Sequence, residues 1–76
     1  MYLQKNFNYL KASKGYSYRD ISIPTSVNMN TINTIANGNE NNIRIETIVK
    51  LANFFELTLD ELVLSDLEEK TKEKEK

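Results

Sequence analysis

The stretch from Gly15 to Gly38 constrains the fold of this chain more than any other; it reads GYSYRDISIPTSVNMNTINTIANG. Ser17 is followed three residues later by Asp20, the spacing of a helix-capping box, so a helix is predicted to begin after Ser17. Pro24 lacks a backbone donor, and its ring clashes with the carbonyl four residues back. We therefore predict that this helix stops one or two residues before the proline.

A second helix is predicted after a break that spans Pro24–Val27. Asn28, or else Ser26, is the expected N-cap, and the helix runs to about Ala36, where the following Asn-Gly pair can end it. Its inward residues share one helical face, and its outward residues are uncharged hydrogen-bonding or apolar side chains. The inward set is Val27, Ile32 and Ile35, and the outward set is Met29, Asn30, Asn33 and Thr34. This pattern is typical of a helix-turn-helix that reads DNA.

The rest of the chain predicts three further helices. Residues 2–13 carry an apolar stripe of Leu3, Phe7 and Leu10 at helical spacing. After a polar loop at residues 39–42, a fourth helix runs from Ile43 or Ile45 to Phe55, and Thr58 with Glu61 caps a fifth. The fourth helix has an apolar face of Ile45, Ile48, Val49, Leu51, Ala52 and Phe55, and the fifth turns Leu59, Leu62 and Val63 inward.

Beyond Leu67 the sequence is charged and has no apolar residue. Such a segment has nothing to bury in return for the entropy of ordering, so we predict a disordered tail over residues 68–76. The remaining residues 1–67 are the length of one small domain with one core. The predicted fold is a compact all-α domain of five helices.

Composition argues against several classes of function. The chain has no cysteine and no histidine, which removes the commonest metal ligands and the commonest acid–base catalyst. Carboxylates such as Glu40 and Glu46 remain, with no spacing that suggests a site. We therefore expect no enzyme activity, cofactor or metal. No apolar run approaches the roughly 20 residues of a membrane span, so a cytoplasmic protein without membrane contact is expected.

The formal net charge of −1 conceals an asymmetry between the two halves. Residues 1–50 hold six lysines and arginines against three acids, a net charge of +3. Residues 51–76 hold four lysines against eight acids, a net charge of −4. The first half can approach DNA while the acidic half points away, although a charge of +3 predicts weak non-specific binding.

In order and spacing, these segments resemble the lambda-repressor/Cro-like (XRE-type) helix-turn-helix family over about 55 residues. The likeness lies in Gly15-Tyr16-Ser17, Ile21, Val27-Asn28, Thr31-Ile32, Ile35, Asn37-Gly38, Ile45-Glu46-Thr47-Ile48, Lys50-Leu51-Ala52 and Leu57-Thr58-Leu59-Asp60-Glu61-Leu62. The departures fall in the motif. Tyr18 replaces a usual glutamine, Ser22 an alanine, Thr25 a leucine and Ser26 a glycine. We predict that Ile23 turns inward in place of that leucine.

The resemblance implies that the helix after the break lies in the major groove of DNA. An asparagine amide can bind adenine through two hydrogen bonds, and methionine or threonine methyl groups can pack on thymine, so an A·T-rich operator is expected. Backbone amides at the start of the preceding helix and near Asn37–Asn39 would hold phosphates, with Lys14 and Arg44 as weaker candidates. The expected DNA-binding residues are Tyr18, Arg19, Asn28, Met29, Asn30, Asn33, Thr34, Asn37 and Asn39. The alternative is that the exposed asparagines do not bind DNA and that the ten asparagines of the chain reflect an A·T-rich coding background.

One such helix reads only a few base pairs, so a homodimer on two half-sites is expected. The predicted contact lies around the fifth helix and comprises Leu57, Leu59, Val63, Leu64 and Leu67. The function expected is a sequence-specific transcriptional regulator of double-stranded DNA, a repressor. The alternative is a protein-interaction module or an antitoxin-like domain that binds a partner protein and has weak or no DNA binding.

Overall fold

The structure of the chain is a computed structural model that describes residues 1–39 and 42–74. Within these residues it contains α-helices and no strand, which confirms the predicted all-α class. The predicted count of five helices is wrong, because the described part of the chain forms six. They are α1 (Leu3–Lys14), α2 (Tyr18–Thr25), α3 (Met29–Ala36), α4 (Ile45–Phe54), α5 (Leu59–Leu64) and α6 (Leu67–Lys74).

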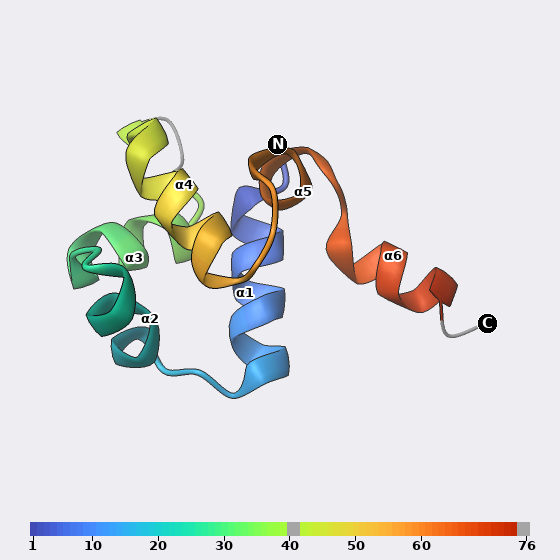
Figure 1. The fold of residues 1–76 in the computed structure, drawn as a ribbon, viewed down its shortest axis with the longest axis horizontal. Helices are drawn as coiled ribbons and strands as arrows, with labels where there is room; N and C mark the ends of the chain where they lie inside the picture. Colours follow the sequence, from blue (N-terminus) through green and yellow to red (C-terminus); the bar gives the residue numbers. More distant parts are fainter. Residues whose placement is uncertain (40–41, 75–76) are drawn as a thin grey trace.

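Helix α1 separates two parts of the molecule (Figure 1). It packs against α3 on one side and against α5 and α6 on the other, while α4 contacts α2 and α5. The N-terminus lies beside α5, where the amide of Tyr2 donates to the carbonyl of Val63 at 2.7 Å. The arrangement therefore puts the α2–α3 pair and the C-terminal helix α6 on opposite sides of α1.

The core between these helices is apolar and continuous. The rings of Phe7 and Phe55 meet edge to face, with their centroids 6.4 Å apart. Each large apolar side chain buried here contributes roughly 1.5–3 kcal/mol to folding. The fully buried apolar residues are Leu3, Phe7, Ile21, Ile32, Ile35, Leu51 and Leu62, and all but Ile21 were predicted to lie on an inward or apolar helix face.

The predicted core face of α4 is too wide. Ile45 is 59% exposed and Val49 is 39% exposed, so their assignment to the core was wrong. At 100° per residue they lie at the border of the face that carries Ile48, Leu51 and Ala52, and that narrower face already fills the contact with the neighbouring helices. Ile45 and Val49 remain as an exposed apolar pair one helical turn apart.

Helix α2 continues through its proline to Thr25, so the predicted stop before Pro24 was wrong. Only one intrahelical hydrogen bond is lost at a proline, and the carbonyl concerned belongs to the exposed Asp20, where water can bind it. Because the helix stays regular, Ile21 and Thr25 share the inward face, and Ile23 points outward. Ile23 is 69% exposed, which contradicts the prediction that it replaces the missing leucine.

Two hydroxyl groups close the turn between α2 and α3. The buried Thr25 donates from Oγ1 to the carbonyl of Ile21 at 2.6 Å and accepts from the amide of Val27 at 3.2 Å. Ser22 donates from Oγ to the carbonyl of Val27 at 2.6 Å. Ser26 takes the left-handed conformation, with φ of 60°, that a glycine would adopt more easily. The departures from the family pattern thus supply their own hydrogen bonds and preserve the turn.

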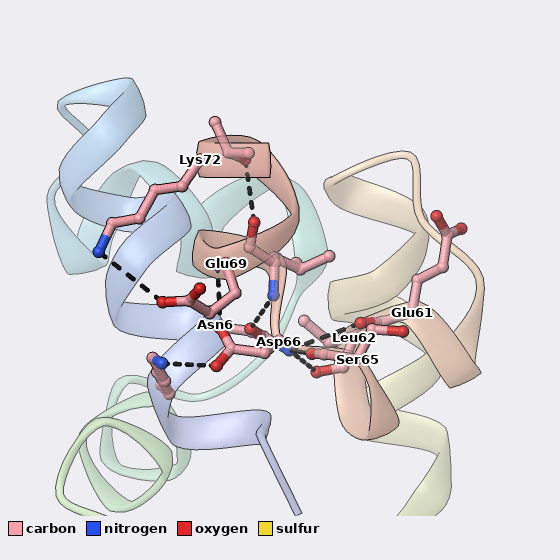
Figure 2. A network of polar contacts seen from close by, with 10 residues as sticks. Asn6, Glu61, Leu62, Ser65, Asp66, Glu69 and Lys72 are labelled. Carbon is pink, nitrogen blue, oxygen red and sulfur yellow. Dashed lines mark hydrogen bonds and ion pairs between the residues drawn. The ribbon is translucent and has the colours of Figure 1, made fainter. Parts of the chain in front are cut away.

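Helix α6 occupies residues that were predicted to be disordered, so that prediction is wrong as far as Lys74. The start of the helix is held by polar contacts that reach across to α1 (Figure 2). Asp66 accepts from the amide of Glu69 at 3.3 Å and from Nζ of Lys5 at 2.7 Å. Lys72 and Glu69 form an ion pair along the helix at 3.8 Å. Capping and pairing therefore order a segment that has almost no apolar surface to bury.

The side chain of Asn6 joins α1 to both α5 and α6 (Figure 2). It is fully buried; its amide nitrogen donates to the carbonyls of Leu62 and Ser65, each at 2.6 Å. Its amide oxygen accepts from the amide of Leu67 at 3.1 Å. One side chain thus satisfies the carbonyl of Leu62 in α5, the carbonyl of the C-cap residue Ser65 and the first amide of α6.

Part of the predicted loop at residues 39–42 lies outside the described residues, which omit positions 40 and 41. None of the helices in the described ranges is long and apolar enough to cross a membrane.

Candidate nucleic-acid interface

The start of α3 is fixed by its own first residues. Asn28 is the N-cap, as predicted, and its side-chain oxygen accepts from the amide of Asn30 at 2.7 Å. The oxygen of this side chain is therefore committed to the helix, and its amide nitrogen is the group left to face a ligand.

The outward side of α3, which we call the reading face, consists of Met29, Asn30, Asn33 and Thr34. The side chains of Asn30 and Asn33 lie three residues apart on one helical face, are exposed, and have no hydrogen-bond partner among the described residues. Thr34 donates its hydroxyl to the carbonyl of Asn30 at 2.8 Å, which leaves its methyl group and oxygen lone pairs available. The reading face carries two unpaired amides and no charge.

The start of α2 is closed by the predicted capping box. Ser17 Oγ accepts from the amide of Asp20 at 3.1 Å, and Asp20 accepts from the amide of Ser17 at 2.8 Å. The hydrogen bond from the Ser17 amide, with a smaller contribution from the Ser17 side chain, lowers the pKa of the Asp20 carboxyl. The carboxylate therefore opposes an anion at this end of α2, and any phosphate there depends on nearby cations.

Two such cations lie close to the first turn of α2. Arg19 is exposed, and Lys11 of α1 places its Nζ 4.7 Å from the centroid of the Tyr18 ring. A cation over an aromatic ring is attracted by its negative face. Lys11 is thereby held next to Tyr18, one of the residues predicted to contact DNA, and the sequence alone gave no reason to expect this contact.

The end of α3 differs from the prediction. The backbone amides of Asn37, Gly38 and Asn39 donate to the carbonyls of Asn33, Ile35 and Thr34 respectively, at 3.0–3.1 Å. The expectation that these amides bind phosphates was therefore wrong, since each already has a partner. Asn37 and Asn39 keep exposed side chains at this end of the helix, and only these side chains remain candidates for contact with DNA.

A hollow of about 420 Å³ lies between the reading face and α4. Arg44 stands at the N-cap position of α4, where a cation opposes the helix dipole and contributes nothing to capping. The hollow is lined by Asn30, Thr31, Thr34, Asn42, Ile43, Arg44 and Thr47.

The structure thus groups the predicted residues into three places. Asn28 and the reading face lie together on α3, Tyr18 and Arg19 lie at the start of α2, and Asn37 and Asn39 follow the end of α3. Contact of any of them with DNA stays a prediction. Among the described residues, no group of three or more acidic side chains is placed to hold a metal ion.

Comparison with known proteins agrees with this arrangement. No curated protein and no solved structure matches the chain significantly. A sequence model of the Cro/C1-type HTH DNA-binding domain matches residues 6–68, which contain α2 to α5 entirely and most of α1. This match covers well over half of the chain and confirms the resemblance drawn from the motif. The chain therefore belongs to the family of Cro/C1-type helix-turn-helix DNA-binding domains.

Proposed function

We propose that this DNA-binding domain is a transcriptional repressor that reads an A·T-rich operator through α3 as a homodimer. The observation that carries the proposal is the pair of unpaired, exposed amides of Asn30 and Asn33 on the reading face. An amide in the major groove can accept from N6 and donate to N7 of adenine at once. The exposed Met29 and the methyl group of Thr34 can pack against the methyl group of thymine.

Phosphate contacts flank this face in the proposed complex. Arg44 lies across the hollow from Asn30 and Thr34, so it can bind the backbone of the same groove. Lys11 and Arg19 can bind phosphates on the other side of the reading face, beside Tyr18 at the start of α2. Few phosphates are engaged in this arrangement, and base contacts have to supply most of the preference for the operator.

A homodimer through α5 remains part of the proposal, with a smaller surface than the sequence suggested. Leu57, Leu59 and Val63 are half-buried and pack against the core, whereas Leu64 is 66% exposed. Leu64 is therefore the residue of α5 with the most apolar surface left for a second copy. Sedimentation equilibrium of the wild type and of Leu64→Asp tests this, since a dimer through α5 dissociates in the variant.

In the proposed mechanism, the protein represses transcription by occupying the operator. A domain bound across two half-sites about one DNA turn apart excludes other proteins from that segment. The proposal therefore requires that expression from a promoter overlapping the selected operator falls when the protein is present.

Selection from a random duplex library at two salt concentrations tests the proposed function. The expected result is a symmetric A·T-rich site of two half-sites spaced by about 10 base pairs, with binding that weakens as salt increases. If no duplex is retained even at low salt, the proposal is wrong, and a protein-binding role for the same fold becomes the better account.

A further inference from the structure

The last four carbonyls of α3 are all satisfied, and the way the final one is satisfied is unusual. The carbonyls of Asn33, Thr34 and Ile35 accept from the three amides that follow the helix. A helix end normally leaves its last carbonyls to water or to a following turn. The carbonyl of Ala36 instead accepts from two side chains of α1, those of Gln4 and Asn8, each at 3.1 Å.

Gln4 and Asn8 lie one helical turn apart on the face of α1 that meets α3. The glutamine amide also packs against Gly38 so closely that a Cβ atom added there would meet its side chain at 3.0 Å. Both amides thus converge on the last turn of α3 and the residue that ends it. Because Gln4 and Asn8 are themselves exposed, neither is needed to fill the core.

Helix α1 is well placed to act as a fixed support for α3. Leu3 and Phe7 are buried in the core, and Asn6 anchors its other side to α5 and α6. Helix α3 has eight residues, which makes it about 12 Å long. A small tilt of α3 about Ala36 therefore shifts the amides of Asn30 and Asn33 relative to the bases. Hydrogen bonds to base edges weaken when the donor and acceptor atoms lie outside about 2.7–3.2 Å of each other.

We infer that Gln4 and Asn8 are positioning residues for α3, which set its tilt against α1 and thereby the sequence preference of the reading face. This inference rests on the proposed function, since it concerns how the reading face is held while it contacts base edges. The two amides do not contact DNA in this account. They act through the carbonyl of Ala36.

The variants Gln4→Met and Asn8→Ala, alone and combined, test the inference. Methionine keeps the length of the glutamine side chain and loses its amide, and alanine removes the second donor while favouring helix. Asn53→Ala is the matched control, because it removes an exposed amide from α4 on the side of α2, away from the carbonyl of Ala36. Affinities are measured for the duplex selected by the wild type and for duplexes that differ from it at one base pair.

The expected result is a loss of discrimination. The ratio of the affinity for the selected duplex to the affinity for a duplex with one changed base pair falls roughly threefold in each single variant. It falls roughly tenfold in the double variant, and a tenfold change is about 1.4 kcal/mol. The slope of affinity against salt stays that of the wild type, since no phosphate contact is lost. Faster hydrogen exchange of the amides that follow α3 is expected in the same variants and not in Asn53→Ala.

Three outcomes overturn the account, and they differ from one another. If the double variant discriminates as well as the wild type, the positioning role is wrong while the proposed function stands. A loss of affinity that is equal for both duplexes indicates a structural role only, and it also overturns the inference. If the wild type itself retains no duplex, the proposed function fails, and the inference about specificity fails with it. The single variants decide the matter should the double variant not fold.

Discussion

Helix α1 holds its neighbours through side-chain amides on two sides, and the two sides differ in depth. On the side of α5 and α6, the amide of Asn6 is fully buried and uses both its nitrogen and its oxygen (Figure 2). On the side of α3, the amides of Gln4 and Asn8 are exposed and share one carbonyl. The same chemical group therefore secures a buried junction on one side and adjusts an exposed helix end on the other.

This difference in burial predicts that one side of α1 determines the stability of the fold and the other side determines DNA binding. A buried polar group that loses its partner costs the full free energy of desolvation, whereas an exposed one can exchange its partner for water. Substitutions at the α5–α6 junction should therefore change the free energy of unfolding. Substitutions on and around α3 should change DNA binding while the fold persists.

The largest effect on stability is expected for Asn6→Ala. The substitution leaves the carbonyls of Leu62 and Ser65 and the amide of Leu67 without their partner. We expect a loss of about 2–4 kcal/mol in the free energy of unfolding, measured by urea denaturation, together with a loss of helix signal from α6. Asn8→Ala is the exposed control. A loss below about 1 kcal/mol for Asn6→Ala would show that water replaces these hydrogen bonds.

The variants Asn30→Ala and Asn33→Ala should show the opposite behaviour. Each is expected to weaken binding to the selected duplex by about 1–3 kcal/mol, because one bidentate contact to a base is lost. Their unfolding free energies should stay within about 0.5 kcal/mol of the wild type, since both side chains are exposed. Titration by fluorescence anisotropy measures the first quantity and urea denaturation the second. If the stability falls and the binding does not, the reading face has been wrongly identified.

A smaller gain is expected at the turn that leads into α3. Ser26 has a φ of 60°, which strains a residue with a Cβ atom, so Ser26→Gly should stabilise the fold by about 0.5–1 kcal/mol after the flexibility of glycine in the unfolded chain is deducted. Glu56→Gly is the matched variant in the turn between α4 and α5, because Glu56 has a φ of 59°. Thermal unfolding of both checks the result. A destabilised Ser26→Gly protein would contradict the assignment of strain.

The smallest effect concerns the exposed ion pair of Lys5 and Asp66 at the start of α6. The hydrogen bond from Lys5 lowers the pKa of Asp66 below its usual 3.8. The stabilisation from this pair is therefore complete above pH 3.8 and disappears as the pH falls through the lowered value. For Lys5 the pKa is raised, mainly by the same hydrogen bond, so its contribution is present below pH 10.5 and is lost as the pH rises through the raised value.

Carboxyl chemical shifts in the wild type and in Lys5→Met measure this effect on Asp66. The pKa should return toward 3.8 in the variant, and an unchanged pKa would show that the pair is absent in solution. Asp20, whose pKa is lowered by Ser17 and not by Lys5, serves as the internal reference.

The sequence was sufficient for features that depend on local pattern. Helical spacing of Leu3 and Phe7 predicted the buried side of α1, and the serine–aspartate and threonine–glutamate spacings predicted both capping boxes. Hydrophobic spacing failed where burial depends on neighbouring elements. Ile45 and Val49 extend an apolar stripe that the surrounding helices do not cover. Ile23 is exposed because α2 remains helical through Pro24.

Contacts between distant residues could not be predicted from the sequence. Helix α6 depends on Asn6 and Lys5, which lie about 60 positions earlier in the chain. The occupied amides after α3 and the pair of donors on Ala36 depend on how the helix ends and what packs against it. Those tertiary contacts decide which groups of the candidate site are still free to bind DNA.

The salt dependence of binding tests most directly whether an uncharged α3 reads DNA by hydrogen bonds. Affinity for the selected duplex is measured from low to moderate salt for the wild type, Asn33→Ala and Arg44→Ala. The account predicts that Asn33→Ala lowers affinity at every salt concentration without changing the slope of log affinity against log salt, and that Arg44→Ala reduces the slope by about 1. If Asn33→Ala binds as the wild type does at every salt concentration, the reading face does not contact bases and the central claim is wrong.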